Sequence, residues 1–478
     1  MKKILITGAT GYIGRRLLER LLREDGLQIR LLVRSKRKLR PDTVDKVEVV
    51  EGDTFDQQAL ALALKGIDTA FYLIHSMGAG GDFEDLDRMS AENFREACIA
   101  AGVAKIIYLG GLGVKESASK HLASRIETGE ILSAKPEKIQ TIWFRAGVII
   151  GAGSASFEII RNLVQKLPIM ITPTWVKTKT QPVGVEDVVS YLAAAIDCPF
   201  PENTIVDIGA ETMSFKEMML AAGRLMGLKR WMMPVPVLSP RLSSYWLILF
   251  TPIPYKMAAA LVDGLKSETI VLNANAQKYF PQIKPRSYDT IIRDALREIE
   301  EDQVLSRWCD SSAGQFCDIR DRDLVSQAIL RDVRRIGLGG ATPDQVFKSM
   351  CAVGGESGWF TYNFLWRIRG LIDKLVGGYG LSRGRRSSNS LRVGDALDFW
   401  KVADIKENKR LLLLAQMKLP GKAWLEFDIQ SDALVQTAHF LPRGILGRLY
   451  WYSVLPLHHF VFRDLARKIV DQANKLPR

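Results

Sequence analysis

Short apolar runs alternate with longer stretches of helical periodicity along the first part of the chain. The strand-like runs occupy residues 3–7, 29–33, 47–50, 69–74, 105–109, 141–144 and 204–208, and the helix-like stretches include 12–23, 83–101, 122–132 and 214–226. Strands that alternate with helices in this way form βαβ units. The pattern therefore predicts an α/β fold, a Rossmann-type doubly wound parallel sheet, over residues 1–230.

The character of the sequence changes at about residue 230, where Met, Pro, Trp and Leu become frequent. Prolines at positions 234, 236, 240, 252 and 254 interrupt any long regular helix. We expect residues 231–305 to form a small substrate or lid subdomain of the same unit. A charged, cysteine-bearing stretch at 298–322 is the best candidate for a linker.

Beyond this linker, residues 320–478 have the pattern of a separate domain. The segments are a helix at 343–351, an aromatic-rich stretch at 359–376, a Gly/Ser/Arg loop at 377–390, and strand-like runs at 396–405, 410–418, 423–430 and 433–440. A final amphipathic helix has Phe462, Leu465 and Ile469 at helical spacing. This order predicts an α+β domain with an antiparallel sheet and a long terminal helix.

The positive charge is concentrated in the predicted C-terminal domain. The whole chain has 66 basic and 53 acidic side chains, a net +13, and residues 320–478 hold 26 and 15 of these, or +11. This excess indicates an anionic partner such as a membrane surface, or else a solvated basic face. No recognised nucleic-acid motif accompanies it, so DNA or RNA binding is not expected.

Cysteine usage and the length of the uncharged runs bear on the compartment. Five scattered cysteines without paired spacing favour neither a disulfide framework nor a zinc site, and the chain starts without an apolar signal segment. The longest uncharged runs, 242–255 and 449–462, have 14 residues each, too few for a spanning helix. We predict a cytoplasmic protein, free or peripheral to the inner face of the membrane, and leave its oligomeric state open.

A glycine-rich turn follows the first strand and opens the first helix. It reads G-A-T-G-Y-I-G at residues 8–14. Gly8 and Gly11 permit a tight turn close to a pyrophosphate, and Gly14 permits close packing of helix on strand. The expected dinucleotide contacts from this segment are Thr7, Gly8, Thr10, Gly11, Tyr12, Ile13 and Gly14.

The end of the second strand indicates which dinucleotide is bound. An NAD-selective site places a carboxylate here, whereas this chain has Arg34 and Ser35, which suit a 2′-phosphate. NADP(H) is therefore favoured, with NAD(H) as the alternative. Asp53 after the third strand is expected near the adenine, and Ile74 and His75 after the fourth strand line the cofactor crevice.

Several of these motifs together resemble a known superfamily. They are T-G-A-T-G-Y-I-G at 7–14, G-D at 52–53, Y-L-I-H-S-M-G at 72–78, F-R-A-G-V-I-I-G at 144–151 and residues 183–188. Residues 1–300 resemble the atypical short-chain dehydrogenase/reductases, in their NmrA-like, complex I accessory subunit-like branch. Residues 320–478 resemble an uncharacterised domain of START-like, helix-grip type, which implies a hydrophobic cavity for a small lipophilic molecule.

The catalytic Ser and the Tyr-x-x-x-Lys motif typical of that superfamily are missing. Gly110-Gly111 stands where the Ser is expected, and His121 and Arg125 take the places of Tyr and Lys. His121 is a candidate proton donor, Arg125 could orient the nicotinamide ribose, and His75 is a candidate ligand contact. Ser117 and Ser119 are possible hydroxyl substitutes. No metal site is predicted, because His458 and His459 diverge on a helix and lack companions.

Three functions remain open on this evidence. The first is an NADP(H)-dependent oxidoreductase that acts on a hydrophobic substrate. The second is a non-catalytic NADP(H)-binding redox sensor, and the third is a membrane-associated assembly or scaffold protein. In the third, the C-terminal domain would bind a lipophilic ligand or anionic lipid.

Overall fold

The computed structural model describes most of the chain. The described residues are 1–75, 83–115, 118–172, 174–234, 263–264, 267–301, 304–306, 325, 328–355, 358–375 and 390–476. The chain divides into two compact units, the first ending at residue 311 and the second beginning at 312. Most of the Pro-rich segment predicted as a lid, the charged linker and the Gly/Ser/Arg loop lie outside the described residues.

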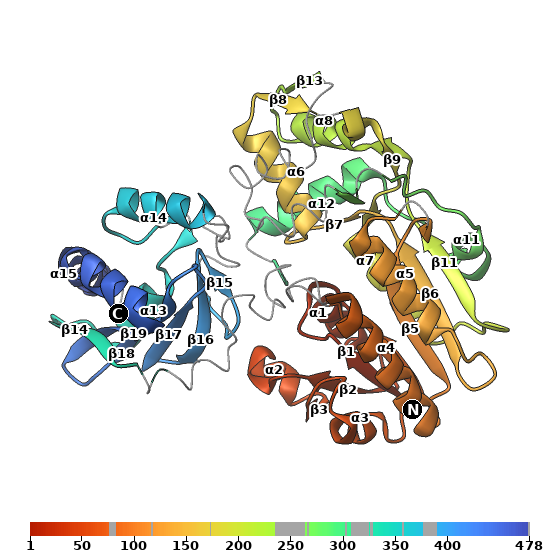
Figure 1. The fold of residues 1–478 in the computed structure, drawn as a ribbon, viewed down its shortest axis with the longest axis horizontal. Helices are drawn as coiled ribbons and strands as arrows, with labels where there is room; N and C mark the ends of the chain where they lie inside the picture. Colours follow the sequence, from red (N-terminus) through yellow and green to blue (C-terminus); the bar gives the residue numbers. More distant parts are fainter. Residues whose placement is uncertain are drawn as a thin grey trace. The chain divides into compact units, whose positions relative to one another are not determined.

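The first unit is built on a seven-stranded parallel sheet (Figure 1). Its strands are β1 (Lys2–Thr7), β2 (Leu27–Val33), β3 (Glu48–Glu51), β4 (Thr69–Tyr72), β5 (Lys105–Gly111), β6 (Gln140–Ala146) and β11 (Thr204–Ile208). Their order across the sheet is β11-β6-β5-β4-β1-β2-β3. The strands after β1 are added first on one side of it and, from β4 on, on the other side, so the strand order reverses between β1 and β4. The predicted doubly wound sheet is confirmed, and its switch point, where such folds bind ligands, lies between β1 and β4.

Helices cover both faces of this sheet. The described helices of the unit are α1 (Tyr12–Leu21), α2 (Pro41–Val44), α3 (Gln57–Leu64), α4 (Phe83–Ala100), α5 (Lys120–Leu132), α6 (Ala155–Lys166), α7 (Val185–Ala194), α8 (Phe215–Leu225), α11 (Asn275–Tyr279) and α12 (Tyr288–Glu300). In β1, Ile4 and Ile6 join the core under α1 and α7, while Leu5 joins the core under α3, α4 and α5. Both faces of the central strand are buried, which explains its uninterrupted apolar run.

Three short strand pairs lie beyond the main sheet. They are β7 (Ile149–Ile150) with β10 (Val183–Gly184), β8 (Ile169–Thr172) with β13 (Trp231–Pro234), and β9 (Lys179–Thr180) with β12 (Met213–Ser214). Residues after the Pro-rich segment return to the first unit. Phe280 is buried in the core under α7, and the Tyr288 hydroxyl of α12 donates to the Met218 carbonyl of α8 at 3.0 Å.

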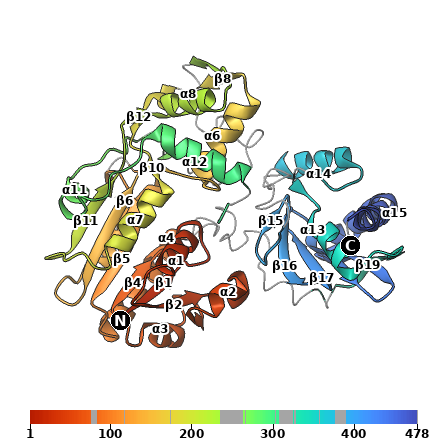
Figure 2. The same cartoon turned by 180° about the vertical axis from the view of Figure 1, so that it is seen from behind.

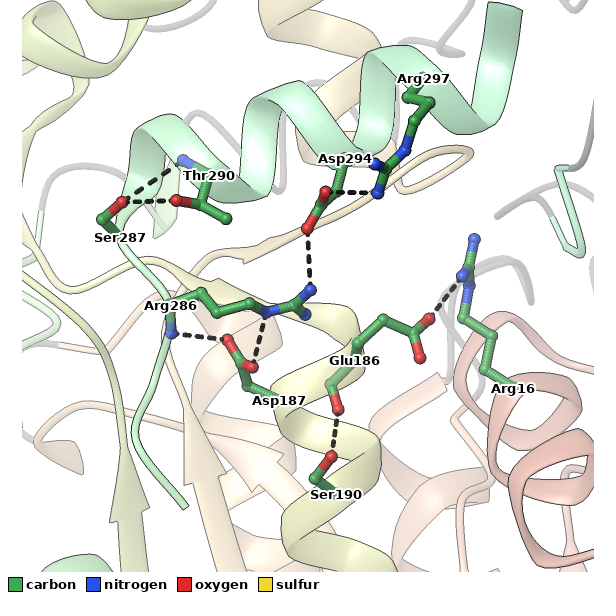
Figure 3. A network of polar contacts seen from close by, with 9 residues as sticks. All are labelled: Arg16, Glu186, Asp187, Ser190, Arg286, Ser287, Thr290, Asp294 and Arg297. Atoms are coloured by element: carbon green, nitrogen blue, oxygen red, sulfur yellow. Dashed lines mark hydrogen bonds and ion pairs between the residues drawn. The ribbon is translucent and has the colours of Figure 1, made fainter. Parts of the chain in front are cut away.

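Ion pairs around the buried Arg16 side chain join α1 to α7 and α12, and Figure 3 shows the pair with α7. The Arg16 side chain, 4% exposed, donates to Glu186 at 2.7 Å and to Glu298 at 2.5 Å. Asp187, which follows Glu186 in α7, accepts from Arg286. The Arg286 guanidinium also pairs with Asp294 of α12 at 2.9 Å. Since α1 begins in the glycine turn, this network fixes the helix that presents the turn.

Removal of the Arg16 charge should therefore destabilise the first unit. We expect Arg16→Met to lower the free energy of unfolding by about 3 kcal/mol, because Glu298 loses its partner in a largely buried setting. Arg20→Met is the matched control, since the exposed Arg20–Glu24 pair on the same helix is worth less than about 1 kcal/mol. Urea denaturation of both variants measures the difference, and equal losses would contradict this role of Arg16.

The second unit contains a six-stranded antiparallel sheet (Figure 2). Its elements are β14 (Leu330–Gly337), α13 (Pro343–Cys351), α14 (Asn363–Leu375), β15 (Ala396–Leu397), β16 (Trp400–Lys406), β17 (Arg410–Ala415), β18 (Gly421–Ile429), β19 (Ala433–Pro442) and α15 (Gly444–Ala473). The strand order is β14-β19-β18-β17-β16-β15. The predicted antiparallel sheet with a long terminal helix is confirmed, while β14 is a strand that the pattern did not predict.

The core of the second unit lies between one sheet face and the helices α13 and α15. Leu411 and Leu413 of β17 join it, and the Ser349 hydroxyl of α13 donates to the Ile469 carbonyl of α15 at 2.7 Å. Leu412 and Leu414 bury the other face of the same strand. Among the described helices, including α15 with its 30 residues, none is sufficiently long and apolar to cross a membrane.

Candidate active site

The glycine turn lies against the carboxyl end of β4. Gly8 has a φ of +70°, and a Cβ there would approach the Leu73 carbonyl to well under 3.0 Å. A Cβ on Gly14 would meet the Gly8 carbonyl equally closely. Gly11 is the N-cap of α1 and provides no capping side chain, so the first amide groups of the helix remain available to an anion. The turn therefore has the geometry of a phosphate site at the switch point of the sheet.

The other predicted residues of this segment have structural contacts of their own. The Thr7 hydroxyl donates to the Phe71 carbonyl at 2.8 Å and accepts from the Leu73 amide at 3.3 Å, so it ties β1 to β4. The Tyr12 phenol donates to the Ala152 carbonyl at 3.2 Å. These side chains hold the turn in place, and contact with a dinucleotide would fall to the backbone of Thr10, Gly11 and Ile13.

The residues around the predicted 2′-phosphate position are exposed to different degrees. Arg34 is exposed and, among the described residues, has no hydrogen bond or ion pair, whereas Ser35 is half-buried. Asp53 is exposed and accepts from the Phe55 amide at 2.9 Å, and Ile74 packs against the core under α4. A 2′-phosphate could therefore bind Arg34 without breaking an existing hydrogen bond or ion pair of the described residues.

Arg15 is a further basic residue at this place, which the sequence argument missed. Its guanidinium donates to the Thr10 carbonyl in the glycine turn and to the Lys38 carbonyl after β2, both at 3.2 Å. It therefore bridges the phosphate turn and the loop that carries Arg34. The signal was present in the sequence, because Arg15 follows Gly14 directly and so lies in the first turn of α1.

Three side chains from three separate segments form a hydrogen-bonded chain beside the switch point. His75 follows β4, His121 lies in the first turn of α5, and Asp87 comes from α4. His75 Nε2 lies 3.0 Å from His121 Nδ1, and His75 Nδ1 lies 3.0 Å from Asp87 Oδ2. The Asp87 side chain is 5% exposed and also accepts from the Ser124 hydroxyl at 3.1 Å. The structure thus brings together the two predicted histidines and adds a buried carboxylate.

The carboxylate determines how protons are arranged along this chain. An ionised Asp87 only accepts hydrogen bonds, so His75 carries its proton on Nδ1 and presents an unprotonated Nε2. His121 then donates from Nδ1 to that nitrogen, which leaves His121 Nε2 as the outer end of the chain. Within the described residues this nitrogen has no partner. It can accept a proton from an alcohol or, once protonated, donate one to a carbonyl oxygen.

Burial and neighbouring charge tune the same group. Burial lowers the pKa of His121 well below 6.5, and the adjacent His75 and Arg125 lower it further, against the opposing effect of Asp87. Burial also lowers the pKa of His75, and the hydrogen bond that His75 donates to Asp87 partly offsets this effect. Both rings are therefore neutral at neutral pH. A neutral His121 favours removal of a proton from bound alcohol, and proton donation becomes easier as the pH falls.

Arg125 makes hydrogen bonds within the unit, and its predicted contact with the nicotinamide ribose stays a prediction. Its Nη2 donates to the Leu109 carbonyl at the end of β5 at 2.8 Å, and its own carbonyl accepts from the Tyr108 phenol. Its buried Nε has no hydrogen-bond partner in the described part of the chain. Arg125 therefore anchors α5 to β5, beside His121.

The two serines proposed as hydroxyl substitutes have different outcomes. Ser119 caps α5 by accepting from the Leu122 amide. Ser117 lies outside the described residues, as do residues 76–82.

The packing explains why a serine does not follow β5. A Cβ on Gly110 would collide with the indole nitrogen of Trp143, and one on Gly111 would collide with Leu122 of α5. The space that a hydroxyl side chain would need is filled by the core. A side chain at Gly110 or Gly111 would therefore require its neighbours to move.

Comparison with protein families finds a match in each of the two units. Residues 8–142 match a family model described as NAD(P)H-binding. The first unit therefore has a Rossmann-type fold, and this part of it is similar to NAD(P)H-binding domains. Residues 324–465 match a family described only as a protein of unknown function, so the START-like assignment of the second unit stays a prediction.

Similar proteins of known name are reductases. The chain is 29% identical over 243 residues to a ceramide reductase of Caulobacter vibrioides, an alignment that spans 49% of this chain and 73% of that protein. It is 27% identical over 179 residues to a 2-alkyl-3-oxoalkanoate reductase of Stenotrophomonas maltophilia, spanning 32% of this chain and only 52% of that protein. The chain thus resembles two proteins that are named as reductases.

Solved structures support the fold. A triphenylmethane reductase of Citrobacter sp. superimposes with a TM-score of 0.51 at 22% identity, covering 62% of this chain and 99% of that one. The same reductase complexed with NADP(H) gives a TM-score of 0.50 at 21% identity, covering 61% and 99%. At these identities the likeness shows a shared fold alone.

Proposed function

We propose that this protein is an NADP(H)-dependent oxidoreductase that interconverts a carbonyl group and an alcohol on a hydrophobic substrate. The observation that carries the proposal is the Asp87–His75–His121 chain, which ends in a histidine nitrogen at the carboxyl edge of the sheet. A merely nucleotide-binding domain has no need of a buried carboxylate that orients two successive imidazoles. This chain therefore favours catalysis over the role of a redox sensor.

The residues of the site divide the reaction between them. The nicotinamide, when bound, supplies a hydride to the carbonyl carbon. His121 supplies the proton to the carbonyl oxygen from Nε2, so that hydride and proton together give the alcohol. Before the transfer, the two histidines together carry one positive charge, which Asp87 stabilises. After His121 has given up its Nε2 proton, its Nδ1 proton still forms the hydrogen bond to His75. Asp87 and His75 are positioning residues, and His121 is the proposed catalytic residue.

The hydrophobic character of the substrate rests on the relatives. The two similar reductases are named for ceramide and for 2-alkyl-3-oxoalkanoate. Both names denote compounds with alkyl chains, and we propose a long-chain ketone as the substrate class. The direct test is NADPH oxidation by the purified protein with a panel of long-chain 3-oxo compounds. Turnover with such a ketone supports the proposal, and nucleotide binding without turnover on the whole panel contradicts it.

The pH dependence of the two directions should differ in sign. Reduction needs protonated His121, and because burial lowers the pKa of this group below 6.5, its protonated fraction falls about tenfold per pH unit from neutral pH upward. We therefore expect kcat/KM for reduction to rise steadily from about pH 8 to pH 6, while that for alcohol oxidation stays flat. Asp87→Asn removes the charge that favours protonation, so it should shift the reduction profile to lower pH. Identical profiles for the variant and the parent protein would contradict the role of Asp87.

The preference for NADP(H) is proposed from Arg34 with Arg15 beside it. A charge-assisted contact to a 2′-phosphate contributes about 1.5–3 kcal/mol. Arg34→Asp should therefore weaken NADPH binding at least about tenfold and leave NADH binding nearly unchanged. Tryptophan fluorescence titration measures both affinities. Arg23→Asp, an exposed arginine beyond the C-terminal end of α1, is the control. Equal weakening of both nucleotides by Arg34→Asp would contradict the assignment.

A further inference from the structure

The first half of α15 carries a row of exposed apolar side chains. Six of them are more than half exposed, namely Ile445, Leu446, Leu449, Tyr452, Leu457 and Phe460. Positions 446, 449, 453, 457 and 460 are three or four residues apart, and positions 445 and 452 lie directly beside them, so these residues share one face of the helix. The opposite face, with Gly447, Trp451 and Leu465, is buried against the sheet. One face of α15 thus packs in the core of the second unit, and a second apolar face of the same helix is exposed.

The polar residue within this row does not interrupt it. Ser453 is exposed, but its hydroxyl donates to the Tyr450 carbonyl one turn earlier at 2.7 Å. Its hydrogen-bonding capacity is partly met inside the helix, so contact with an apolar environment costs little.

The neighbouring helix α14 adds a second exposed apolar row. Phe364, Ile368, Leu371 and Ile372 are each more than half exposed. The two helices are in contact, since Trp366 and Phe462 lie with ring centroids 6.3 Å apart and the Arg369 guanidinium covers the Tyr450 ring at 5.2 Å. We call these two rows together the α14–α15 face. Apolar surface of this extent on one part of a protein marks a binding site for a partner or a membrane.

The charged residues along the exposed row of α15 are arginines. Between positions 443 and 463 there is no acidic residue, and the charged residues are Arg443, Arg448 and Arg463, all exposed. Arg367 is exposed among the apolar residues of α14. Two carboxylates of these helices make contacts within the unit: Asp464 accepts from the Tyr362 hydroxyl and lies 3.8 Å from the Arg463 guanidinium, and Asp373 accepts from the Lys418 amide.

An apolar helix face bordered by arginines is complementary to an anionic lipid surface. The apolar side chains can enter the region of the head groups, and the guanidinium groups can pair with lipid phosphates. The uncharged stretch of α15 would extend about 21 Å, less than the roughly 30 Å of a bilayer core, so the helix would lie along the surface. We propose that the α14–α15 face binds the protein to anionic membranes. This proposal is independent of the proposed oxidoreductase activity.

Flotation of the full-length protein with vesicles tests the proposal. Phosphatidylglycerol-containing vesicles are compared with pure phosphatidylcholine vesicles, at low and high salt. We expect flotation with the anionic vesicles only, and at least a tenfold weaker association for Leu449→Glu combined with Leu457→Glu. Leu62→Glu is the matched control, because Leu62 on α3 is 61% exposed, as Leu449 is. All three side chains are exposed, so the variants should fold, which circular dichroism checks.

Three outcomes would overturn the proposal. The first is absence of flotation with anionic vesicles at low salt. The second is equal loss of flotation in the Leu62→Glu control. The third is a dimer in sedimentation analysis that Leu449→Glu with Leu457→Glu dissociates while vesicle binding is unaffected, which would assign the face to a second copy of the chain.

Discussion

His121→Phe is expected to reduce turnover by a factor of about 10²–10⁴ while NADPH binds with unchanged affinity. Phenylalanine keeps the ring volume but removes the nitrogen that ends the Asp87–His75–His121 chain. The loss should appear in kcat rather than in the binding of the nucleotide, since the glycine turn and Arg34 are untouched. Steady-state rates and fluorescence titration on the same preparation separate the two effects.

The control for this substitution is His459→Phe. His459 is exposed on α15, in the other unit, and no described contact links it to the histidine chain. It should keep full activity. If His121→Phe retained more than about a tenth of the parent rate, a role in acid–base catalysis would be contradicted. If it lost nucleotide binding as well, the histidine would belong to the structure of the crevice instead.

Gly8→Ala should eliminate measurable NADPH binding up to about a millimolar, a free energy weaker than roughly −4 kcal/mol. The residue has a φ of +70°, and its added Cβ would press on the Leu73 carbonyl, a backbone atom that cannot move aside. The turn would have to shift away from β4, and its amide groups would no longer converge on a phosphate.

Gly26→Ala is the matched control for the backbone conformation. Gly26 has a φ of +82°, but nothing lies within 4 Å of the position that its Cβ would take. It should therefore cost about 1–2 kcal/mol of stability and leave nucleotide affinity intact. Loss of NADPH binding in both variants would indicate general destabilisation rather than a specific effect at the turn.

The doubly wound sheet was predictable from sequence because its physical cause is local. A strand buried on both faces must be apolar throughout, as Ile4 to Ile6 are, and the glycines at 8, 11 and 14 follow it directly. The antiparallel sheet of the second unit was predictable for a similar reason. β14 was missed because its polar residues, such as Arg331 and Arg335, conceal the alternation, and it pairs with β19, which is distant in sequence.

The candidate site was predictable only in part. His75 and His121 could each be chosen from their places at the end of a strand and the start of a helix, but their hydrogen bond joins residues 46 positions apart. Asp87 could not be identified as a site residue from the sequence. It shares the start of α4 with Glu84 and Asp85, and only the folded packing buries Asp87 and leaves Asp85 exposed. Likewise, nothing local in the sequence shows that Arg125 donates to the Leu109 carbonyl.

Transfer of deuterium from NADPH is the most direct test of the account. The protein is incubated with NADPH labelled at the hydride position and a long-chain 3-oxo compound, and the product is analysed by mass spectrometry. The account predicts an alcohol with one deuterium on the former carbonyl carbon, formed by the parent protein and not by His121→Phe. Tight NADPH binding without deuterium in the alcohol from any of the long-chain ketones would contradict it, and the first unit would then be a nucleotide-binding domain without this activity.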